Sequence, residues 1–152
     1  MKIRTAARED APALVEFNQA MALETEGRQL DSETLSRGVS AVFDEEQKGF
    51  YVVAEDNGAI IGGLLVTYEW SDWRNGWFWW IQSVFIRPEA RGRSVYSRLY
   101  KFVKEKAAQQ ANVCGFRLYV EKENEHAQAV YEKLGMEKTY YFMYEEASKL
   151  SL

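Results

Sequence analysis

The chain has 152 residues, 47% of them hydrophobic and 14% aromatic, a composition that predicts one folded domain over residues 1–152 and excludes a disordered protein. Its formal net charge of -4 argues against a general binder of nucleic acids or of membrane surfaces. One cysteine and one histidine exclude a disulfide framework and a histidine-rich metal site, so we expect no metal. The first ten residues carry no apolar segment of a signal peptide, and no run reaches the length of a membrane span, which predicts a cytoplasmic protein.

Hydrophobic spacing in the first half of the chain predicts a strand, two helices and two β-hairpins. In chain order these elements cover residues 2–6, 8–26, 31–43, 49–70 and 77–86. Asp56-Asn57-Gly58 and Asn75-Gly76 are typical hairpin turns, and each lies between runs rich in β-branched and aromatic residues. Asp10 is a candidate N-cap for the first helix, since a proline follows in the first turn.

The second half of the chain predicts two further helices, each followed by a strand. In chain order these elements cover residues 91–109, 115–121, 125–135 and 137–146. The order β-α-α-β-β-β-α-β-α-β predicts an α/β fold with an α+β mixed sheet of about six to seven strands flanked by about four helices. The strand–helix–strand unit between residues 77 and 121 should join parallel strands, and ligands bind beyond the carboxyl ends of such strands.

The turn after residue 86 combines a strand stop, a flexible position and positive charge. Pro88 ends the pairing of the strand, and Gly92 permits a positive φ or a close backbone approach. The helix that follows presents unpaired N–H groups and the positive end of its dipole. The arginines around this turn are Arg87, Arg91, Arg93 and Arg98. Backbone donors and guanidinium groups together indicate a phosphate site, and the alternative is a solvated, basic helix start.

A second motif lies in NEHAQAVYEKLGM, residues 124–136. Helical spacing places Ala127 and Tyr131 on one face, a turn apart. The small alanine lets another backbone or a ligand come close, and Tyr131 can offer its hydroxyl to that ligand.

These two motifs, and the element order of the whole chain, resemble those of the GNAT superfamily of acetyl-CoA-dependent N-acetyltransferases. VFIRPEARGRSVYSRL is similar to the family's phosphate loop, Val-x-Pro-x-x-Arg-Gly-x-Gly-x-Gly, and NEHAQAVYEKLGM to its segment Asn-x-x-Ala-x-x-x-Tyr-x-x-x-Gly-Phe. Ser94 and Tyr96 depart from the family pattern, which has glycine and a small residue there. Because Tyr96 is bulky, we expect it to point away from the phosphates and to pack along the helix with Tyr100.

The resemblance implies how the chain binds its donor, acetyl-CoA. Backbone N–H groups of the turn would hold the pyrophosphate, with added charge from Arg91 and Arg93. A bulge in the strand before the turn, typical of this family, would part the two parallel strands and leave a gap for the thioester. The implied cofactor-binding residues are Val84, Phe85, Ile86, Arg91, Gly92, Arg93, Ser94, Val95, Tyr96, Asn124 and Tyr131.

The resemblance also implies catalytic roles. The backbone N–H of Val84 would polarise the thioester carbonyl, and Tyr131 would protonate the leaving thiolate. A primary amine with a pKa of about 10.4 is almost entirely protonated at neutral pH, so a base or a desolvating pocket must help. Glu26 is the favoured base, directly or through a water, and Glu24 is its rival. The alternative is that both are solvated acids at a helix end.

Aromatic residues concentrate in YEWSDWRNGWFWWIQ, residues 68–82. Alternation sends residues 77, 79 and 81 to one face of the strand and residues 78, 80 and 82 to the other. Most of these rings should pack across the hairpin, but an aromatic face beside an acid also suits an ammonium group, and exposed aromatics also mark dimer contacts. The expected acceptor-site residues are Glu24, Glu26, Trp70, Asp72, Trp73 and Gln82.

We therefore expect an N-acetyltransferase that transfers acetyl from acetyl-CoA to a primary amine by direct attack. A small cationic molecule is the favoured acceptor because the chain is acidic, and a protein N-terminus or a lysine is the alternative. The alternative of another class is a GNAT-fold module that binds CoA and regulates or assembles without catalysis, since Ser94 and Tyr96 alter the loop. We expect no nucleic-acid or membrane partner, and the aromatic block leaves a homodimer open.

Overall fold

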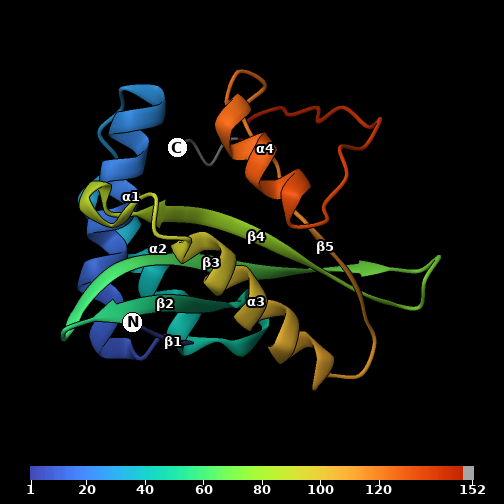
Figure 1. Ribbon diagram of the computed structural model, residues 1–152, viewed down its shortest axis with the longest axis horizontal. Helices are drawn as coiled ribbons and strands as arrows, with labels where there is room; N and C mark the ends of the chain where they lie inside the picture. The colour runs from blue at the N-terminus through green and yellow to red at the C-terminus, as the bar shows by residue number, and fades with distance from the viewer. Residues whose placement is uncertain (149–152) are drawn as a thin grey trace. The chain divides into compact units, whose positions relative to one another are not determined.

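The computed structural model describes residues 1–148 of the chain (Figure 1). These residues form two compact units, the first running from Met1 to Tyr119 and the second beginning at Val120. A single domain over residues 1–152 stays a prediction. No helix in the described part of the chain is both long enough and apolar enough to cross a bilayer.

The first unit is a five-stranded sheet with helices on both faces. In chain order its elements are β1 (Lys2–Thr5), η1 (Arg8–Asp10), α1 (Ala11–Glu26), α2 (Ser32–Asp44), η2 (Glu46–Lys48), β2 (Phe50–Asp56), β3 (Ala59–Ser71), β4 (Gly76–Ile86), η3 (Pro88–Ala90), α3 (Val95–Ala108) and β5 (Val113–Arg117). The strands lie side by side in chain order, and the pairs are antiparallel except for β4 and β5, which are parallel. The mixed sheet and the parallel strand–helix–strand unit are thereby confirmed.

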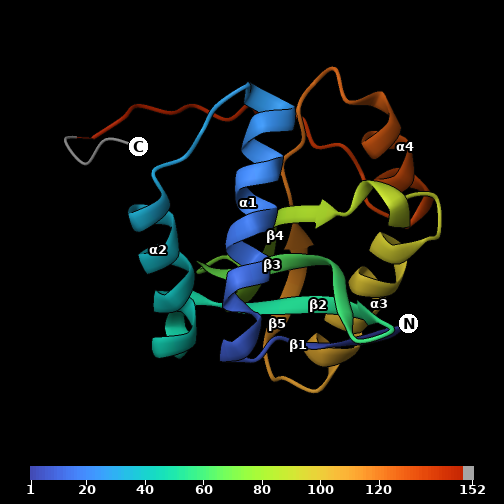
Figure 2. The ribbon, with the colours of Figure 1, turned by 90° about the vertical axis from the view of Figure 1, so that its left-hand side faces the viewer.

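Alternation along the strands builds a separate core on each face of the sheet. On β2, Tyr51 and Val53 pack with Phe17 of α1 and Val39 of α2. The next residue, Val52, points to the other face and is fully buried. Figures 1 and 2 show α1 and α2 over one face of the sheet and α3 over the other. Each large aliphatic side chain buried in this way contributes about 1.5–3 kcal/mol to folding.

Both predicted hairpins are present, but the second turn covers residues 72–75, and Gly76 already belongs to β4. Asn57 and Gly58 both have positive φ, 51° and 79°, as a two-residue turn with the twist of the flanking strands requires. The second hairpin is longer, because β3 has 13 residues and β4 has 11. At its tip the Asp72 carboxylate accepts a hydrogen bond of 2.9 Å from the backbone N–H of Trp73.

The second unit contains one helix, α4 (Glu125–Lys133), among its described residues. Asn124 is its N-cap, and its side-chain oxygen accepts a hydrogen bond of 3.1 Å from the backbone N–H of Ala127. The predicted final strand over residues 137–146 is wrong, because no helix or strand is formed there. Aromatic composition favours a strand, but a strand also needs a partner for its backbone hydrogen bonds, and no described segment pairs with this one. The sheet therefore has five strands where six to seven were expected.

Two other elements begin or end at residues different from those predicted. The third helix begins at Val95 and not at residue 91, because Gly92 and Ser94 adopt positive φ and cannot belong to a right-handed helix. The strand expected over residues 115–121 is Val113–Arg117.

Asp10 is a structural carboxylate that ties the first strand to the first helix. It was expected to cap α1, but it makes no side-chain bond to that helix. Instead it accepts two hydrogen bonds from the Arg4 guanidinium, of 2.7 and 3.1 Å, and one of 2.7 Å from the backbone N–H of Ala7. Arg4 also donates to Glu55 of β2 at 2.9 Å. The bonds from Arg4, and then the bond from Ala7, hold the pKa of Asp10 below its usual range against the effect of its burial.

Replacing Asp10 by asparagine should lower the free energy of unfolding at pH 7 by about 1–3 kcal/mol, the range for a buried charged hydrogen bond. Because the pKa of Asp10 is lower in the folded than in the unfolded chain, its ionised form stabilises the fold above about pH 4. That stabilisation is lost as the pH falls through the folded-state pKa. Urea unfolding of the wild type and Asp10→Asn between pH 2 and 7 measures both effects.

The matched control is Asp44→Asn, which breaks the exposed pair between Arg8 and Asp44. Exposed pairs contribute about 0–1 kcal/mol, so this variant should change little. Equal losses in the two variants would contradict the special role of Asp10.

Candidate functional site

A β-bulge interrupts β4 at Ser83. Leu65 of β3 lies opposite Gln82, and Gly63 lies opposite Phe85, so the one residue between them on β3 faces two residues on β4. Ser83 has a positive φ of 51°. This extra residue shifts the alternation by one position, which turns Phe85 toward α1, where its ring lies 5.2 Å from that of Phe17. The bulge implied by the family resemblance is therefore present.

Beyond the middle of β4, one edge of the strand has no partner. The parallel ladder with β5 runs from Trp77–Val113 to Trp80–Arg117 and ends there. On the other edge β3 stays paired with β4 as far as Ile86. Among residues 1–148, no strand pairs with residues 81–86 on the β5 side. Such an edge can hold an extended chain by backbone hydrogen bonds, and it contains Val84, Phe85 and Ile86.

The free edge leads into a turn with two left-handed residues. Gly92 has a φ of 78° and Ser94 a φ of 59°, and α3 begins directly after them. The backbone N–H groups of a turn of this kind, together with the first turn of the helix, form a concave site that suits an anion. Tyr96 stacks on Tyr100 with ring planes 9° apart, as expected for a side chain packed along the helix.

The arginines around this turn are already bound to groups of the chain itself. Arg87 donates to the Ile60 carbonyl and to Glu16, Arg91 to the Ile86 carbonyl and to Glu24, Arg93 to Asp56, and Arg98 to the Met1 carbonyl. The pKa of Asp56 is held low mainly by its bond from Arg93. The positive charge inferred from the sequence is therefore partly neutralised, and the backbone donors are the least committed part of the turn.

Five of the six predicted acceptor residues fall at two ends of the first unit, and the sixth, Gln82, lies between them on β4. Glu24 lies at the end of α1, and its 3.0 Å pair with Arg91 holds it beside the carboxyl end of β4. Glu26 is on the same helix end, with an oxygen 3.8 Å from the Arg28 guanidinium. Trp70, Asp72 and Trp73 surround the hairpin tip, at the opposite end of an 11-residue strand about 33 Å long (Figure 1). The two groups cannot line one small site in a single copy of this unit.

A polar cluster lies between these ends, on the face that α1 and α2 also cover, and of its members the sequence predicted only Gln82 as a site residue. The Glu69 carboxylate accepts hydrogen bonds from the Trp80 indole N–H at 2.7 Å and from Arg117 at 3.0 Å. Gln82 donates to the hydroxyl of Thr67 on the same face. The Arg117 guanidinium lies 3.6 Å from the centroid of the Phe78 ring, and the rings of Trp80 and Tyr119 lie 6.3 Å apart. We call Thr67, Glu69, Trp80, Gln82, Arg117 and Tyr119 the Glu69 cluster.

The remaining predicted residues lie in the second unit. The Asn124 side chain is used as the cap of α4. Burial raises the pKa of Tyr131, so its phenol stays protonated at neutral pH. In the described part of the chain, no group of three or more histidine, cysteine or acidic side chains is placed to hold a metal ion.

Comparison with known proteins points to one family. A family model described as the acetyltransferase (GNAT) family matches residues 12–136. The solved structure of a possible acetyltransferase from Clostridium difficile 630 is 42% identical, with a TM-score of 0.88 over 97% of each chain. No curated protein matches the sequence.

Two more distant structures share the fold. A predicted acetyltransferase with acetyl-CoA from Clostridium acetobutylicum is 18% identical, with a TM-score of 0.78 over 95% of each chain. Glucosamine-6-phosphate N-acetyltransferase from Arabidopsis thaliana is 20% identical, with a TM-score of 0.75 over 97% of this chain and 98% of that one.

The bulge gives a testable stability order at residue 83. At a positive φ, glycine is unstrained, and a β-branched side chain is the most strained. We expect Ser83→Val to be about 1–2 kcal/mol less stable than Ser83→Gly, with Ser83→Ala between them, in urea unfolding at pH 7. If Ser83→Val were the most stable of the three, the left-handed backbone at this position would be wrong.

Proposed function

This chain belongs to the GNAT family of acetyltransferases, and from that premise we propose that it transfers the acetyl group of acetyl-CoA to a primary amine by direct attack. The observation that carries the proposal is the unpaired edge of β4, which begins beside a bulge and leads into a left-handed turn at the start of α3. Acetyl-CoA, when bound, supplies the activated thioester, and the chain supplies binding, orientation and proton transfer.

Features of the first unit fit the chemistry of this donor. The unpaired backbone of Val84, Phe85 and Ile86 offers hydrogen bonds to an amide-bearing chain such as pantetheine. The turn at residues 91–96 offers backbone donors to a pyrophosphate. Arg91 and Arg93 are held at this turn by Glu24 and Asp56, and a guanidinium has five donors, so each can bind its carboxylate and still donate to a phosphate.

Tyr131 is the proposed proton donor to the leaving thiolate. Its raised pKa keeps the phenol protonated at neutral pH, which a donor requires. The same shift makes the phenol a weaker acid, so the transfer is more uphill than from an exposed tyrosine. A thiolate that leaves in a desolvated site is also a stronger base than in water, which offsets that cost.

The proposed base is a carboxylate at the end of α1. Glu24 is tied to β4, because Arg91 binds both its carboxylate and the Ile86 carbonyl. Glu26, favoured on the sequence, is more exposed and is 3.8 Å from its nearest cation. We therefore place Glu24 first, directly or through a water. A Glu24→Gln enzyme that kept the acidic limb of its pH–rate profile would return the role to Glu26.

The proposed acceptor is a small cationic amine. The Glu69 cluster supports this proposal better than the hairpin tip does, because it contains the predicted residue Gln82 and joins a carboxylate to the rings of Trp80 and Tyr119. Arg117 offsets part of the negative charge of Glu69, so recognition of the amine here depends on the rings and hydrogen bonds as well as on charge. A protein N-terminus or a lysine is the alternative acceptor, and a CoA-binding module without catalysis is the alternative of another class.

Acetyl-CoA should stabilise the protein against heat. At a concentration 100 times its Kd, a ligand that binds only the folded chain adds about 2.7 kcal/mol, which corresponds to a rise in Tm of about 5–10 °C for a chain of this size. Differential scanning fluorimetry with acetyl-CoA measures the rise, and adenosine, which lacks the pyrophosphate and pantetheine, is the control. The absence of any rise in Tm at millimolar acetyl-CoA would contradict the proposal that the protein is an enzyme.

Tyr131→Phe should lower kcat by about 10²–10⁴-fold, the range for a lost general acid. The affinity for acetyl-CoA should change little, because only a hydroxyl is removed. Release of free thiol is measured with a panel of amines, polyamines, amino acids and short peptides, which also identifies the acceptor class. If the variant turned over at the wild-type rate, Tyr131 would have no part in proton transfer. Thermal stabilisation without thiol release from any acceptor would favour the non-catalytic module.

A further inference from the structure

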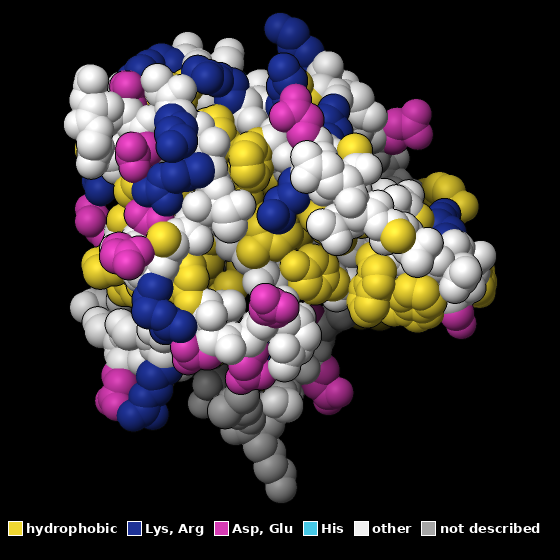
Figure 3. All heavy atoms as spheres, turned by 90° about the horizontal axis from the view of Figure 1, so that it is seen from below, with side chains coloured by type: hydrophobic (Ala, Val, Ile, Leu, Met, Phe, Trp, Pro, Cys, Tyr) yellow, Lys and Arg dark blue, Asp and Glu magenta, His cyan; other side chains and the backbone are white. Residues whose placement is uncertain are grey.

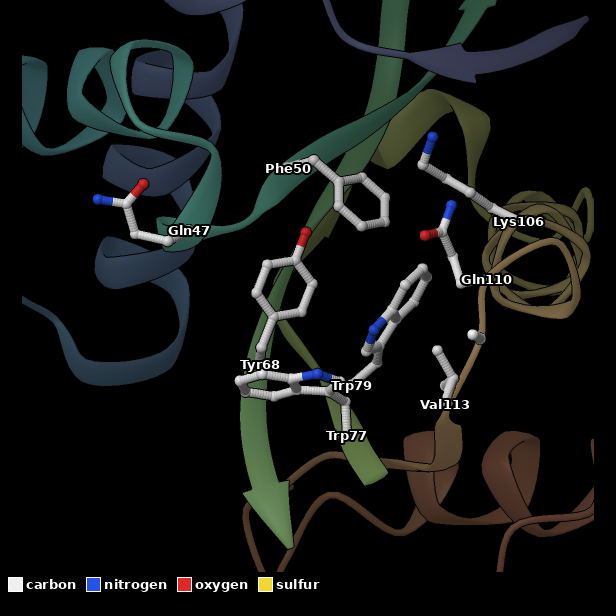
Figure 4. A pocket seen from close by; sticks show the side chains of 9 residues that line it. Gln47, Phe50, Tyr68, Trp77, Trp79, Lys106, Gln110 and Val113 are labelled. Carbon is white, nitrogen blue, oxygen red and sulfur yellow. The ribbon is translucent and has the colours of Figure 1, made fainter. Parts of the chain in front are cut away.

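An aromatic pocket lies on the other face of the sheet, at the end that carries the β3–β4 hairpin. Its volume is about 440 Å³, within the range of small-molecule sites. The pocket is formed by strands β2 to β5, by η2, and by the last turn of α3 with the residues just beyond it. The lining residues are Gln47, Phe50, Tyr68, Trp77, Trp79, Lys106, Gln110, Ala111 and Val113. Seen from below, hydrophobic side chains gather toward the side of the hairpin (Figure 3), and Figure 4 shows the rings around the pocket.

The rings of this pocket form its walls and do not stack on one another. Trp79 meets Phe50 edge to face, with centroids 5.2 Å apart and planes at 73°. Trp77 meets Tyr68 in the same way, with centroids 6.3 Å apart and planes at 67°. Trp77 is 40% exposed and leaves ring surface open to a ligand, whereas Trp79 is almost fully packed within the wall. Stacking and edge contacts with aromatic walls favour a planar aromatic group over an aliphatic one.

The polar groups of the pocket are mostly hydrogen-bond donors. Within residues 1–148, the indole N–H groups of Trp77 and Trp79 have no hydrogen-bond partner, although Trp79 is only 5% exposed. Lys106 has its ammonium 5.2 Å from the centroid of the Phe50 ring and has no carboxylate partner in the described chain. Burial, and then the charge of Glu46, raise the pKa of Tyr68, so its phenol also remains a donor.

The charge of the pocket is uneven. Lys106 and Gln110 come from the end of α3 and lie on one side, whereas Gln47 lies on the opposite side (Figure 4). Gln47 belongs to η2, which also carries Glu46. An anionic group would therefore be favoured at the α3 side, beside Lys106, and disfavoured beside η2. An ammonium ligand would be repelled by Lys106.

We propose that this pocket binds a planar aromatic carboxylate, with its ring among Phe50, Tyr68, Trp77 and Trp79 and its carboxylate on Lys106. The site is distinct from the proposed acetyl-transfer site. The pocket residues of β4 lie seven or more positions from Ile86, about 23 Å or more along the strand, and they point to the opposite face from the Glu69 cluster.

Calorimetric titration of the full chain with 2-naphthoate tests this inference. 2-Naphthamide keeps the ring and loses the charge, and cyclohexanecarboxylate keeps the charge and loses the planar ring. We expect 2-naphthoate to bind at least tenfold more tightly than either compound, as the loss of a charged hydrogen bond or of an aromatic contact implies. Equal binding of 2-naphthoate and 2-naphthamide, or no binding of 2-naphthoate at millimolar concentration, would overturn the proposal.

Lys106→Met keeps most of the side-chain stem and removes the charge. It should weaken 2-naphthoate about tenfold or more and leave 2-naphthamide unchanged, and Lys106→Arg should restore binding. Lys104→Met is the matched control: it lies on the same helix, and its ammonium contacts the Tyr100 ring at 4.7 Å outside the pocket. An equal loss in Lys104→Met would show a general charge effect and overturn the assignment to Lys106.

Trp77 is 40% exposed, so Trp77→Ala should fold, which far-UV circular dichroism checks. This variant should also lose 2-naphthoate binding. Saturating acetyl-CoA should leave binding to the wild type unchanged, and competition would mean that naphthoate occupies the cofactor site. Sedimentation velocity covers the remaining outcome: a wild-type dimer that Trp77→Ala converts to a monomer would make this face a contact between copies and not a ligand site. None of these readouts depends on acetyl transfer, so failure here and failure of the proposed function are separable.

Discussion

An extra residue in β4, at Ser83, decides which side chains reach each face of the sheet on either side of it. Before the bulge, Trp80 and Gln82 point to the same face as α1 and α2 and form part of the Glu69 cluster. Before the bulge, the odd-numbered residues of β4 point to the other face. After it, odd-numbered Phe85 points to the face of α1 and α2, where its ring packs against Phe17. Without the bulge, Phe85 would point to the α3 face, and a large aromatic contact of the first core would be lost. The geometry of the candidate site and the stability of the unit thus depend on the same irregularity.

At the turn after β4, the positive charge of the arginines is partly balanced by nearby carboxylates, so the turn is not a simple positive patch. The arginines that stand out in an acidic chain are held by acids from α1 and from the end of β2, and those pairs draw the turn, the helix and the hairpin together. Exposed pairs of this kind contribute little to stability. Their stronger effect is positional, because they fix guanidinium groups around backbone donors before any ligand arrives, and so reduce the ordering that binding requires.

Patterns carried by neighbouring residues were enough to predict most of the fold. Most helix ends, the hairpin at Asn57-Gly58 and the stack of Tyr96 on Tyr100 depend on local spacing and turn chemistry, which a sequence displays directly. The prediction of a final strand over residues 137–146 failed because a strand needs a partner strand, and local sequence patterns do not show whether a partner lies beside it in the fold. Apart from Gln82, the Glu69 cluster was missed for a related reason: Glu69 and Arg117 meet only through the register of β3, β4 and β5. The alternation that placed Trp80 and Gln82 on one face was the signal that could have found them.

Helix α3 has a consequence for how the two ends of the first unit influence each other. Its first residue follows the left-handed turn, and the residues at and just beyond its last turn, Lys106 and Gln110, line the aromatic pocket about 21 Å away. A helix that keeps one arrangement carries no coupling free energy between the sites at its two ends, because coupling needs an element with two arrangements that both sites bias. The same 14-residue helix thus fixes the separation between the turn and the pocket, and a ligand at one end leaves the affinity at the other end unchanged.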